Sequence, residues 1–96
     1  MRKSNTRKIG AVISDYLREM KIEKKVTEVR LVNSWPAIVG PTIARQTEKV
    51  YIRNGVFFIH IASPVLKNEI SYMKGRIMEV LNEQAGERII TRVVLR

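Results

Sequence analysis

The sequence predicts a single α+β domain with the order α-α-β-β-α-β, in which a three-stranded sheet packs against a long helix. Three observations predict this class. Apolar residues recur at helical spacing through the first forty residues, Asn54-Gly55 separates two β-rich runs, and Ser63-Pro64 opens a second helical pattern that leads into a last β-rich run. A chain of 96 residues with 45% hydrophobic residues is enough for one domain with one core.

Two helices are predicted before the first strand. The apolar spacing places the first over Thr6–Met20 and the second over Glu23–Val39. Pro36 lies inside the second pattern, lacks an N–H and clashes with the preceding turn, so a kink or break is expected there. Gly40 can then close the helix with a positive φ, and Pro41 can begin a short helical turn.

The Asn-Gly pair predicts a type I′ hairpin whose strands are Lys49–Arg53 and Val56–Ala62. A two-residue loop pairs Arg53 with Val56 and, at the far end, Lys49 with His60, and directly paired residues share a face. One face is then wholly apolar and forms the core; it holds Val50, Ile52, Phe57, Ile59 and Ile61. The opposite face holds Lys49, Tyr51, Arg53, Val56, Phe58 and His60.

The second half of the chain predicts one long helix and a closing strand. Ser63 is the expected N-cap of a helix over residues 64–85, and Gly86 is the expected residue after its end. The strand over Arg88–Leu95 follows, and the crossover makes it parallel to its neighbour. Alternation assigns Ile89, Thr91, Val93 and Leu95 to the core face and Arg88, Ile90, Arg92, Val94 and Arg96 to the other face.

The non-core face of this sheet is the predicted nucleic-acid site. It combines the cations Lys49, Arg53, Arg88, Arg92 and Arg96 with the aromatic residues Tyr51 and Phe58. Cations neutralise phosphates and aromatic rings stack on unpaired bases, which is the chemistry that single-stranded nucleic acid requires. In the alternative arrangement the first two helices cover this face, and the aromatic residues are then ordinary core with the arginines at the rim.

The charge balance also points to a polyanionic partner. Eighteen Lys and Arg residues against nine Asp and Glu residues give a formal charge of +9. Residues 1–5 are expected to form a flexible basic arm ahead of a single domain over residues 6–96. The cations at the N-terminus, which would bind nucleic acid without specificity, are Arg2, Lys3, Arg7 and Lys8. Charge that serves only solubility, or an anionic membrane surface, is the alternative interpretation.

Several classes of function are not supported by the sequence. It contains no cysteine, which favours a reducing cytoplasm, and it has no signal-peptide pattern and no apolar run long enough to span a membrane. It lacks a phosphate-binding glycine loop and the hydrolase and metalloprotease motifs, so we expect no catalytic site, no metal and no cofactor. His60 is the single histidine and a poor metal site alone, and Trp35 lies on an apolar stripe and is expected in the core.

A series of small motifs runs through the chain in a fixed order. They are Trp35, Val39, Gly40, Ala44 and Thr47, then Gly55 in the hairpin, then Ser63, Leu66, Glu69 and Ile70, and finally Asn82 and Gly86 before a short basic strand. In these motifs, and over about residues 9–96, the sequence resembles the DciA-like family of bacterial replicative-helicase loaders. The resemblance implies a KH-like fold, DNA binding and a partnership with the hexameric replicative helicase. It therefore favours an accessory protein of DNA replication. An RNA-binding module, or a protein-interaction domain with incidental charge, is the alternative.

Overall fold

The computed structural model describes the backbone of residues 2–96 and the side chains of residues 10–96. Helices come first, then a hairpin, then two helices and a last strand, so the predicted α+β class is confirmed. The elements are α1 (Arg2–Asn33), α2 (Trp35–Val39), α3 (Pro41–Gln46), β1 (Thr47–Arg53), β2 (Val56–Ile61), α4 (Pro64–Ser71), α5 (Lys74–Ala85) and β3 (Arg92–Leu95).

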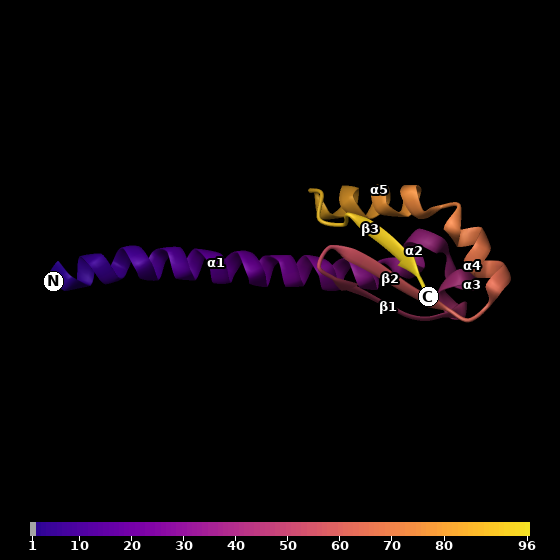
Figure 1. Ribbon diagram of the computed structural model, residues 1–96, viewed down its shortest axis with the longest axis horizontal. Helices are drawn as coiled ribbons and strands as arrows, with labels where there is room; N and C mark the ends of the chain where they lie inside the picture. Colours follow the sequence, from indigo (N-terminus) through magenta and orange to yellow (C-terminus); the bar gives the residue numbers. More distant parts are fainter. Residues whose placement is uncertain (1) are drawn as a thin grey trace.

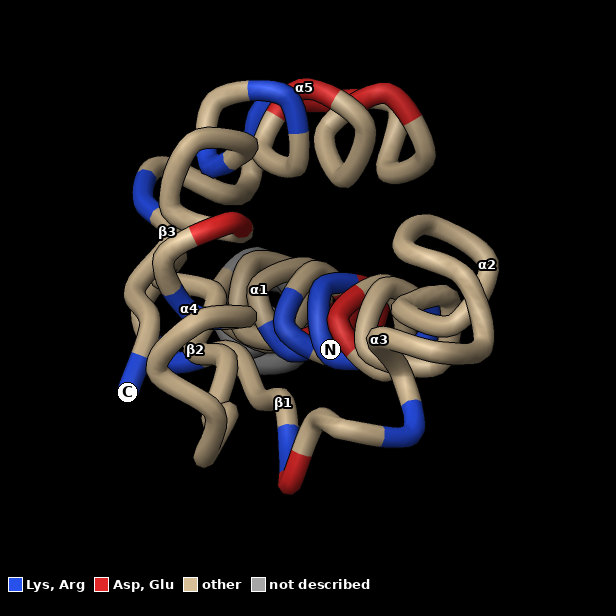
Figure 2. Tube along the Cα trace, turned by 90° about the vertical axis from the view of Figure 1, so that its right-hand side faces the viewer, with Lys and Arg blue, Asp and Glu red and all other residues tan. Residues whose placement is uncertain are grey.

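The molecule has two layers and one long projection. The strands form a sheet in the order β1-β2-β3, with β1 and β2 antiparallel and β2 and β3 parallel. Figure 1 shows α1 leaving this body as a single rod, and the extents are 65 × 21 × 19 Å. Viewed along α1, the strands lie on one side of the molecule and the helices on the other (Figure 2). The body thus has one layer of strands and one layer of helices.

The hairpin has the register that the sequence predicts. Arg53 pairs with Val56, and the ladder continues to the pair of Lys49 and His60. Asn54 and Gly55 both have positive φ, at 53° and 79°, as a type I′ turn requires. Beyond Lys49 the register shifts by a bulge and the strand extends to Thr47. Local turn chemistry is therefore enough to decide which side chains of β1 and β2 face the core.

The two helices predicted at the N-terminus are one continuous helix, so the predicted break between Met20 and Glu23 is wrong. The apolar stripe changes face at Ile22, which favours two helices when the pattern is followed by spacing alone. The two residues between these patterns are Lys21 and Ile22, and neither is a helix breaker such as glycine or proline. The backbone hydrogen bonds therefore continue without interruption. The apolar residues shift to another face of the helix because its environment changes along its length: residues 10–26 are exposed, whereas Leu31 is buried.

The break that Pro36 predicts is present, two residues earlier than the proline. α1 ends at Asn33, Ser34 adopts φ −84° and ψ −5°, and Pro36 lies in the first turn of α2, where a missing N–H is tolerated. Gly40 then turns the chain at φ 91°, and α3 begins at Pro41. α2 and α3 are therefore short helical turns fixed by their prolines and by the glycine between them.

The single helix predicted over residues 64–85 is wrong, because the chain breaks at Tyr72 and Met73 into α4 and α5. α4 packs on β2, whereas α5 packs on β3. The side chains of Ile70 and Ile77 are both buried, so each helix contributes its own residue to the core. At the break the helix tightens, because the N–H groups of Tyr72 and Met73 donate to the carbonyls three residues earlier, those of Glu69 and Ile70, at 3.2 and 2.8 Å. The predicted caps are correct: Ser63 Oγ accepts from the Leu66 N–H at 3.2 Å, and Gly86 is left-handed at φ 78°.

The last strand is shorter than predicted and begins at Arg92. Asn82 holds the segment before it, since its Oδ1 accepts from the N–H groups of Ile89 and Ile90 at 3.0 and 2.8 Å and its Nδ2 donates to the Ile90 carbonyl at 3.0 Å. Ile90, predicted on the non-core face, is therefore fully buried, and Thr91, predicted in the core, is exposed. Alternation holds only within the strand, where Val93 faces the core.

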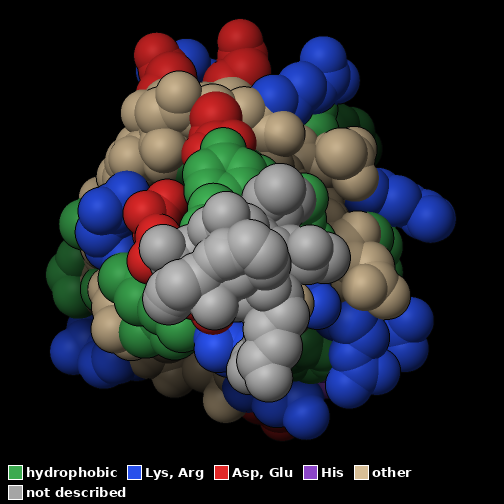
Figure 3. Space-filling model, turned by 90° about the vertical axis from the view of Figure 1, so that its left-hand side faces the viewer, with side chains coloured by type: hydrophobic (Ala, Val, Ile, Leu, Met, Phe, Trp, Pro, Cys, Tyr) green, Lys and Arg blue, Asp and Glu red, His purple; other side chains and the backbone are tan. Residues whose placement is uncertain are grey.

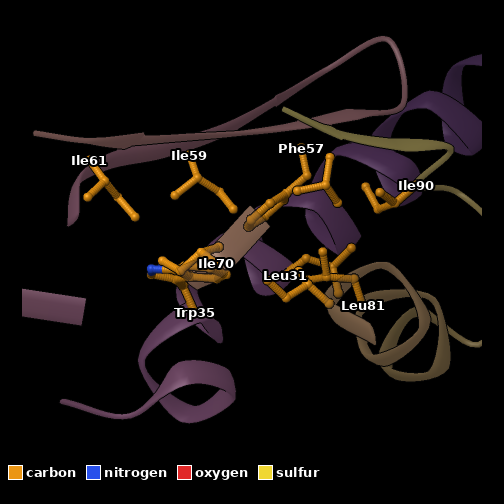
Figure 4. Packing of buried hydrophobic residues seen from close by; sticks show 10 residues of the cluster. Leu31, Trp35, Phe57, Ile59, Ile61, Ile70, Leu81 and Ile90 are labelled. Atoms are coloured by element: carbon orange, nitrogen blue, oxygen red, sulfur yellow. The ribbon is translucent and has the colours of Figure 1, made fainter. Parts of the chain in front are cut away.

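The core lies between the sheet and the helices. In Figure 4 the strand residues Phe57, Ile59 and Ile61 point toward residues of the helical layer. Ten side chains are buried: Leu31, Trp35, Phe57, Ile59, Ile61, Ile70, Ile77, Leu81, Ile90 and Val93. Trp35 is 2% exposed and its ring centroid lies 5.6 Å from that of Phe57, which confirms its place in the core. Its Nε1–H donates to Thr47 Oγ1 at 3.0 Å, and that hydroxyl donates to the Ile43 carbonyl at 2.8 Å.

Replacing Thr47 by valine should destabilise the domain, because it leaves the buried indole N–H of Trp35 without an acceptor. The expected loss in the free energy of unfolding is about 1–3 kcal/mol. It can be measured by urea denaturation followed by fluorescence of this single tryptophan. Thr42→Val, at an exposed position of α3, is the matched control and should change stability by less than about 0.5 kcal/mol. Equal stability of the two variants would show that the hydrogen bond does not support the core.

Candidate nucleic-acid interface

The second face of the sheet is not covered by the helices. All ten core residues lie between the sheet and the helical layer, and Figure 2 shows the helices on that side only. The alternative in which the first helices cover this face is therefore not the arrangement observed. We call this surface the open face; it consists of Lys49, Tyr51, Arg53, Val56, Phe58, His60, Arg92, Val94 and Arg96.

Strand pairing arranges the open face in three rows that cross all three strands. Directly paired residues share a face, so each row follows from the register. The ladder also continues one residue past β3, because the Arg96 N–H donates to the Ile59 carbonyl at 2.8 Å and the Arg96 carbonyl accepts from the Ile61 N–H at 3.0 Å. The rows are Arg53–Val56–Arg92, Tyr51–Phe58–Val94 and Lys49–His60–Arg96.

Aromatic rings form the centre of the open face. Tyr51 and Phe58 are stacked across the two strands, with ring centroids 4.8 Å apart and an angle of 16° between their planes. The His60 ring lies 5.5 Å from the Tyr51 ring at 33°. All three side chains are half-buried, so they are held by the sheet yet remain in contact with solvent. An apolar aromatic centre of this kind is a platform on which an unpaired base can stack.

Two cations lie over these rings. The Nζ of Lys49 is 5.4 Å from the centroid of Tyr51, and the guanidinium carbon of Arg96 is 5.1 Å from the centroid of Phe58. Both distances are within the range of a cation–π interaction, which contributes roughly 0.5–1 kcal/mol at an exposed site. The cations therefore occupy the ring faces that a base would use.

The positive charge of the open face is not neutralised locally. Among the side chains of residues 10–96, the ion pairs within 4.0 Å are Arg18–Asp15 and Arg76–Glu79, and neither involves this face. Viewed from the N-terminal end of α1, red side chains gather at the top over α5, whereas blue side chains gather at the lower right, on the side of the strands (Figure 3). Phosphate groups would meet cations that no ion pair within 4.0 Å engages, with Glu48, next to Lys49 on β1, as an exposed carboxylate nearby along the strand.

The assignment of Arg88 to this face is wrong. Arg88 precedes β3 and lies on the helical side, where it lines a groove with Leu17 and Met20 of α1. The amide contacts of Asn82 to the following two residues take this segment out of the strand, so alternation does not apply to it. Arg53, Arg92, Arg96 and Lys49 remain on the open face as predicted. The side chains of Arg2, Lys3, Arg7 and Lys8 lie outside the described residues, and their role stays a prediction.

His60 is a member of the open face that the sequence alone did not mark as functional. Its Nε2 is shielded from solvent and has no hydrogen-bond partner among the described residues. The hairpin register already paired it with Lys49, on the same face as Tyr51, which is the signal that could have placed it in this surface. No group of three potential metal ligands occurs among the described side chains. Within residues 2–96, none of the helices combines the length and apolarity needed to cross a membrane.

Comparison with known proteins gives two similarities. A family model described as "Dna[CI] antecedent, DciA" matches residues 8–95, nearly the whole chain. The UPF0232 protein of Corynebacterium glutamicum (strain R) is 25% identical over 85 residues, which cover 88% of this chain and 48% of that protein. The chain thus spans about half the length of this curated relative.

Proposed function

The chain belongs to the DciA family, which is associated with helicase loading in DNA replication, and on this premise we propose that it binds single-stranded DNA through the open face as a replication accessory. The observation that carries the proposal is the stacked pair of Tyr51 and Phe58, flanked by cations on an uncovered sheet. The replicative helicase is the protein partner that we propose from family membership.

Binding would exchange contacts within the protein for contacts with the nucleic acid. Arg96 lies over Phe58 in the free protein, where a base would stack. A phosphate can attract the guanidinium away from the ring and a base can take its place. A base stacked on an aromatic side chain contributes roughly 1–3 kcal/mol, which exceeds the roughly 0.5–1 kcal/mol of an exposed cation–π contact. The released cation then pairs with phosphate, so both changes favour the complex.

The open face favours single strands over duplex. Stacking requires bases whose faces are accessible, and in a duplex those faces are covered by neighbouring base pairs. Phosphate and ring contacts do not read base edges. We therefore expect weak sequence preference, as suits a protein that acts wherever a fork opens.

Removing both rings should weaken binding to a fluorescent oligothymidylate by about 30-fold or more, since each stacked base contributes roughly 1–3 kcal/mol. The variant is Tyr51→Ala with Phe58→Ala, measured by fluorescence anisotropy. Tyr51→Leu with Phe58→Leu keeps apolar volume without the π-faces and should bind almost as weakly. Tyr72→Ala, an aromatic residue 81% exposed between α4 and α5, is the control and should bind normally. Wild-type affinity of the leucine variant would exclude stacking.

The salt dependence should report the cations of the open face. For a single strand, the logarithm of affinity falls with the logarithm of salt by about 0.7 per phosphate neutralised. Arg53→Gln with Arg92→Gln should therefore reduce this slope by about 1.4. Lys74→Gln with Arg76→Gln removes the same charge from α5 and should leave the slope unchanged. If both pairs reduce the slope equally, binding depends on net charge and not on this face. Stronger binding to an RNA of the same sequence would favour the RNA-binding alternative.

The proposed partnership with the helicase predicts a complex that does not depend on nucleic acid. The full chain, tagged, should retain the purified hexameric replicative helicase of its host after nuclease treatment, in a pull-down at physiological salt. We place the helicase contact outside the open face, so the Tyr51→Ala with Phe58→Ala variant should retain the helicase equally. Retention that nuclease abolishes would mean that the two proteins are joined only by DNA. An interaction domain without nucleic-acid binding would give retention with no response to the oligothymidylate.

A further inference from the structure

The projecting part of α1 separates its positive and negative side chains onto different sides of the helix. Arg18, Lys21 and Lys25 follow the i, i+3, i+7 spacing that aligns residues on one face, and we call these three residues the basic stripe. The carboxylates follow another line, at i, i+4, i+8: Asp15, Glu19 and Glu23. All six side chains are exposed, so the basic stripe is accessible where α1 extends beyond the body (Figure 1).

The basic stripe continues the side of α1 that packs beside β1. Seven residues after Lys25 the same spacing reaches Val32, which is half-buried and lines two hollows together with Val50 of β1. One of these hollows is also lined by Lys25 and by Tyr51. β1 is the edge strand of the sheet next to α1, and Figure 3 shows cations gathered on the side of the strands. The basic stripe therefore leads to the aromatic centre of the open face.

Two carboxylates lie near the basic stripe, and both leave its cations available to phosphate. The Nη1 of Arg18 is 3.4 Å from the Oδ1 of Asp15, but the two side chains are 70% and 64% exposed. Exposed ion pairs contribute little to stability, so a phosphate can replace this carboxylate. Glu28 lines the hollow with Lys25, and no ion pair within 4.0 Å joins these two side chains.

The basic stripe lies between two regions that the sequence predicts to bind nucleic acid. The open face lies at one end of it, and the N-terminal segment of α1 lies at the other. In the sequence that segment has four cations and no carboxylate: Arg2, Lys3, Arg7 and Lys8. Arg7 precedes Arg18 by eleven residues, which is about three helical turns. A line of positive charge thus connects the sheet with the far end of the helix.

We propose that a single strand bound at the open face continues past Lys25 and along α1, where the basic stripe neutralises its phosphates. This longer path rests on the proposed function and extends the binding site from the sheet to the helix. The basic stripe contains no aromatic residue, so it contacts phosphates and does not stack bases. Arg18 and Lys25 are about 10 Å apart along the helix, enough for two or three phosphates at roughly 3.4 Å or more per phosphate. A short strand fills the open face, and only a longer strand reaches α1.

The length of the strand separates the two parts of the path. Binding of oligothymidylates of about 5 and about 20 nucleotides can be measured by fluorescence anisotropy over a range of salt concentrations. Arg18→Gln with Lys25→Gln should reduce the salt slope of the long strand by about 1.4, because two phosphate contacts are lost, and leave that of the short strand unchanged. Both positions are exposed and glutamine is a good helix former, so circular dichroism should show an intact helix.

Lys24→Gln with Arg88→Gln is the matched control. Both side chains line the groove between α1 and the connection from α5 to β3, on the helical side of the body. The control removes the same charge and should change neither slope. Lys21 also borders this groove and stays unchanged in both variants. An equal reduction by the two pairs would mean that only net charge matters, and it would overturn the path along α1. So would a basic-stripe variant that affects the short and long strands equally.

Chemical protection locates the strand directly, since the chain has no cysteine of its own. Ser14 lies four residues before Arg18, on the line of the basic stripe, whereas Val12 lies on nearly the opposite side of the helix. Ser14→Cys should be protected from iodoacetamide by the long strand at saturation and not by the short one. Val12→Cys should react equally in each case. Equal reactivity of Ser14→Cys with and without the long strand would exclude this path.

The outcomes distinguish the path along α1 from the proposed function. If Arg18→Gln with Lys25→Gln binds the long strand like the wild type while Tyr51→Ala with Phe58→Ala binds weakly, the open face is supported and the path along α1 is wrong. If Tyr51→Ala with Phe58→Ala binds both strands normally, the proposed function is wrong, and the path that starts from the open face is wrong with it.

Discussion

The position of the Trp35 indole determines how the remaining elements of this small domain are arranged. Trp35 begins α2, contacts Phe57 of β2 and donates its N–H to Thr47 at the first residue of β1. It therefore joins the end of the helical segment to both strands of the hairpin. Because α2 and α3 are short turns with little stability of their own, this side chain, together with the buried Leu31 of α1, holds the end of α1 against the sheet. The helices then lie on one face, and the opposite face stays open.

The residues that carry the family resemblance have structural roles. Trp35 and Thr47 form the hydrogen bond described above, Gly55 allows the hairpin turn, Asn82 binds the backbone before β3, and Gly86 ends α5. None of them belongs to the open face. The resemblance therefore rests on residues that build the fold, whereas the proposed contacts with nucleic acid depend on side chains on the surface of the sheet.

The sequence by itself determined the features that depend on residues close together in the chain. These are the hairpin register, the caps at Ser63 and Gly86, the core position of Trp35, and the aromatic and basic residues that share a face of β1 and β2. Each follows from local backbone chemistry or from strict alternation. The folded arrangement was needed to establish that α1 is one helix, where the helix after Ser63 breaks, and why Arg88 and Ile90 depart from alternation. Those features depend on contacts that a local pattern does not show, such as those of the Asn82 amide with the backbone of Ile89 and Ile90, and the packing of α4 on β2 and of α5 on β3. The sequence also left open whether helices cover the second face of the sheet. Alternation along a strand shows which side chains share a face, but it does not show what packs against that face.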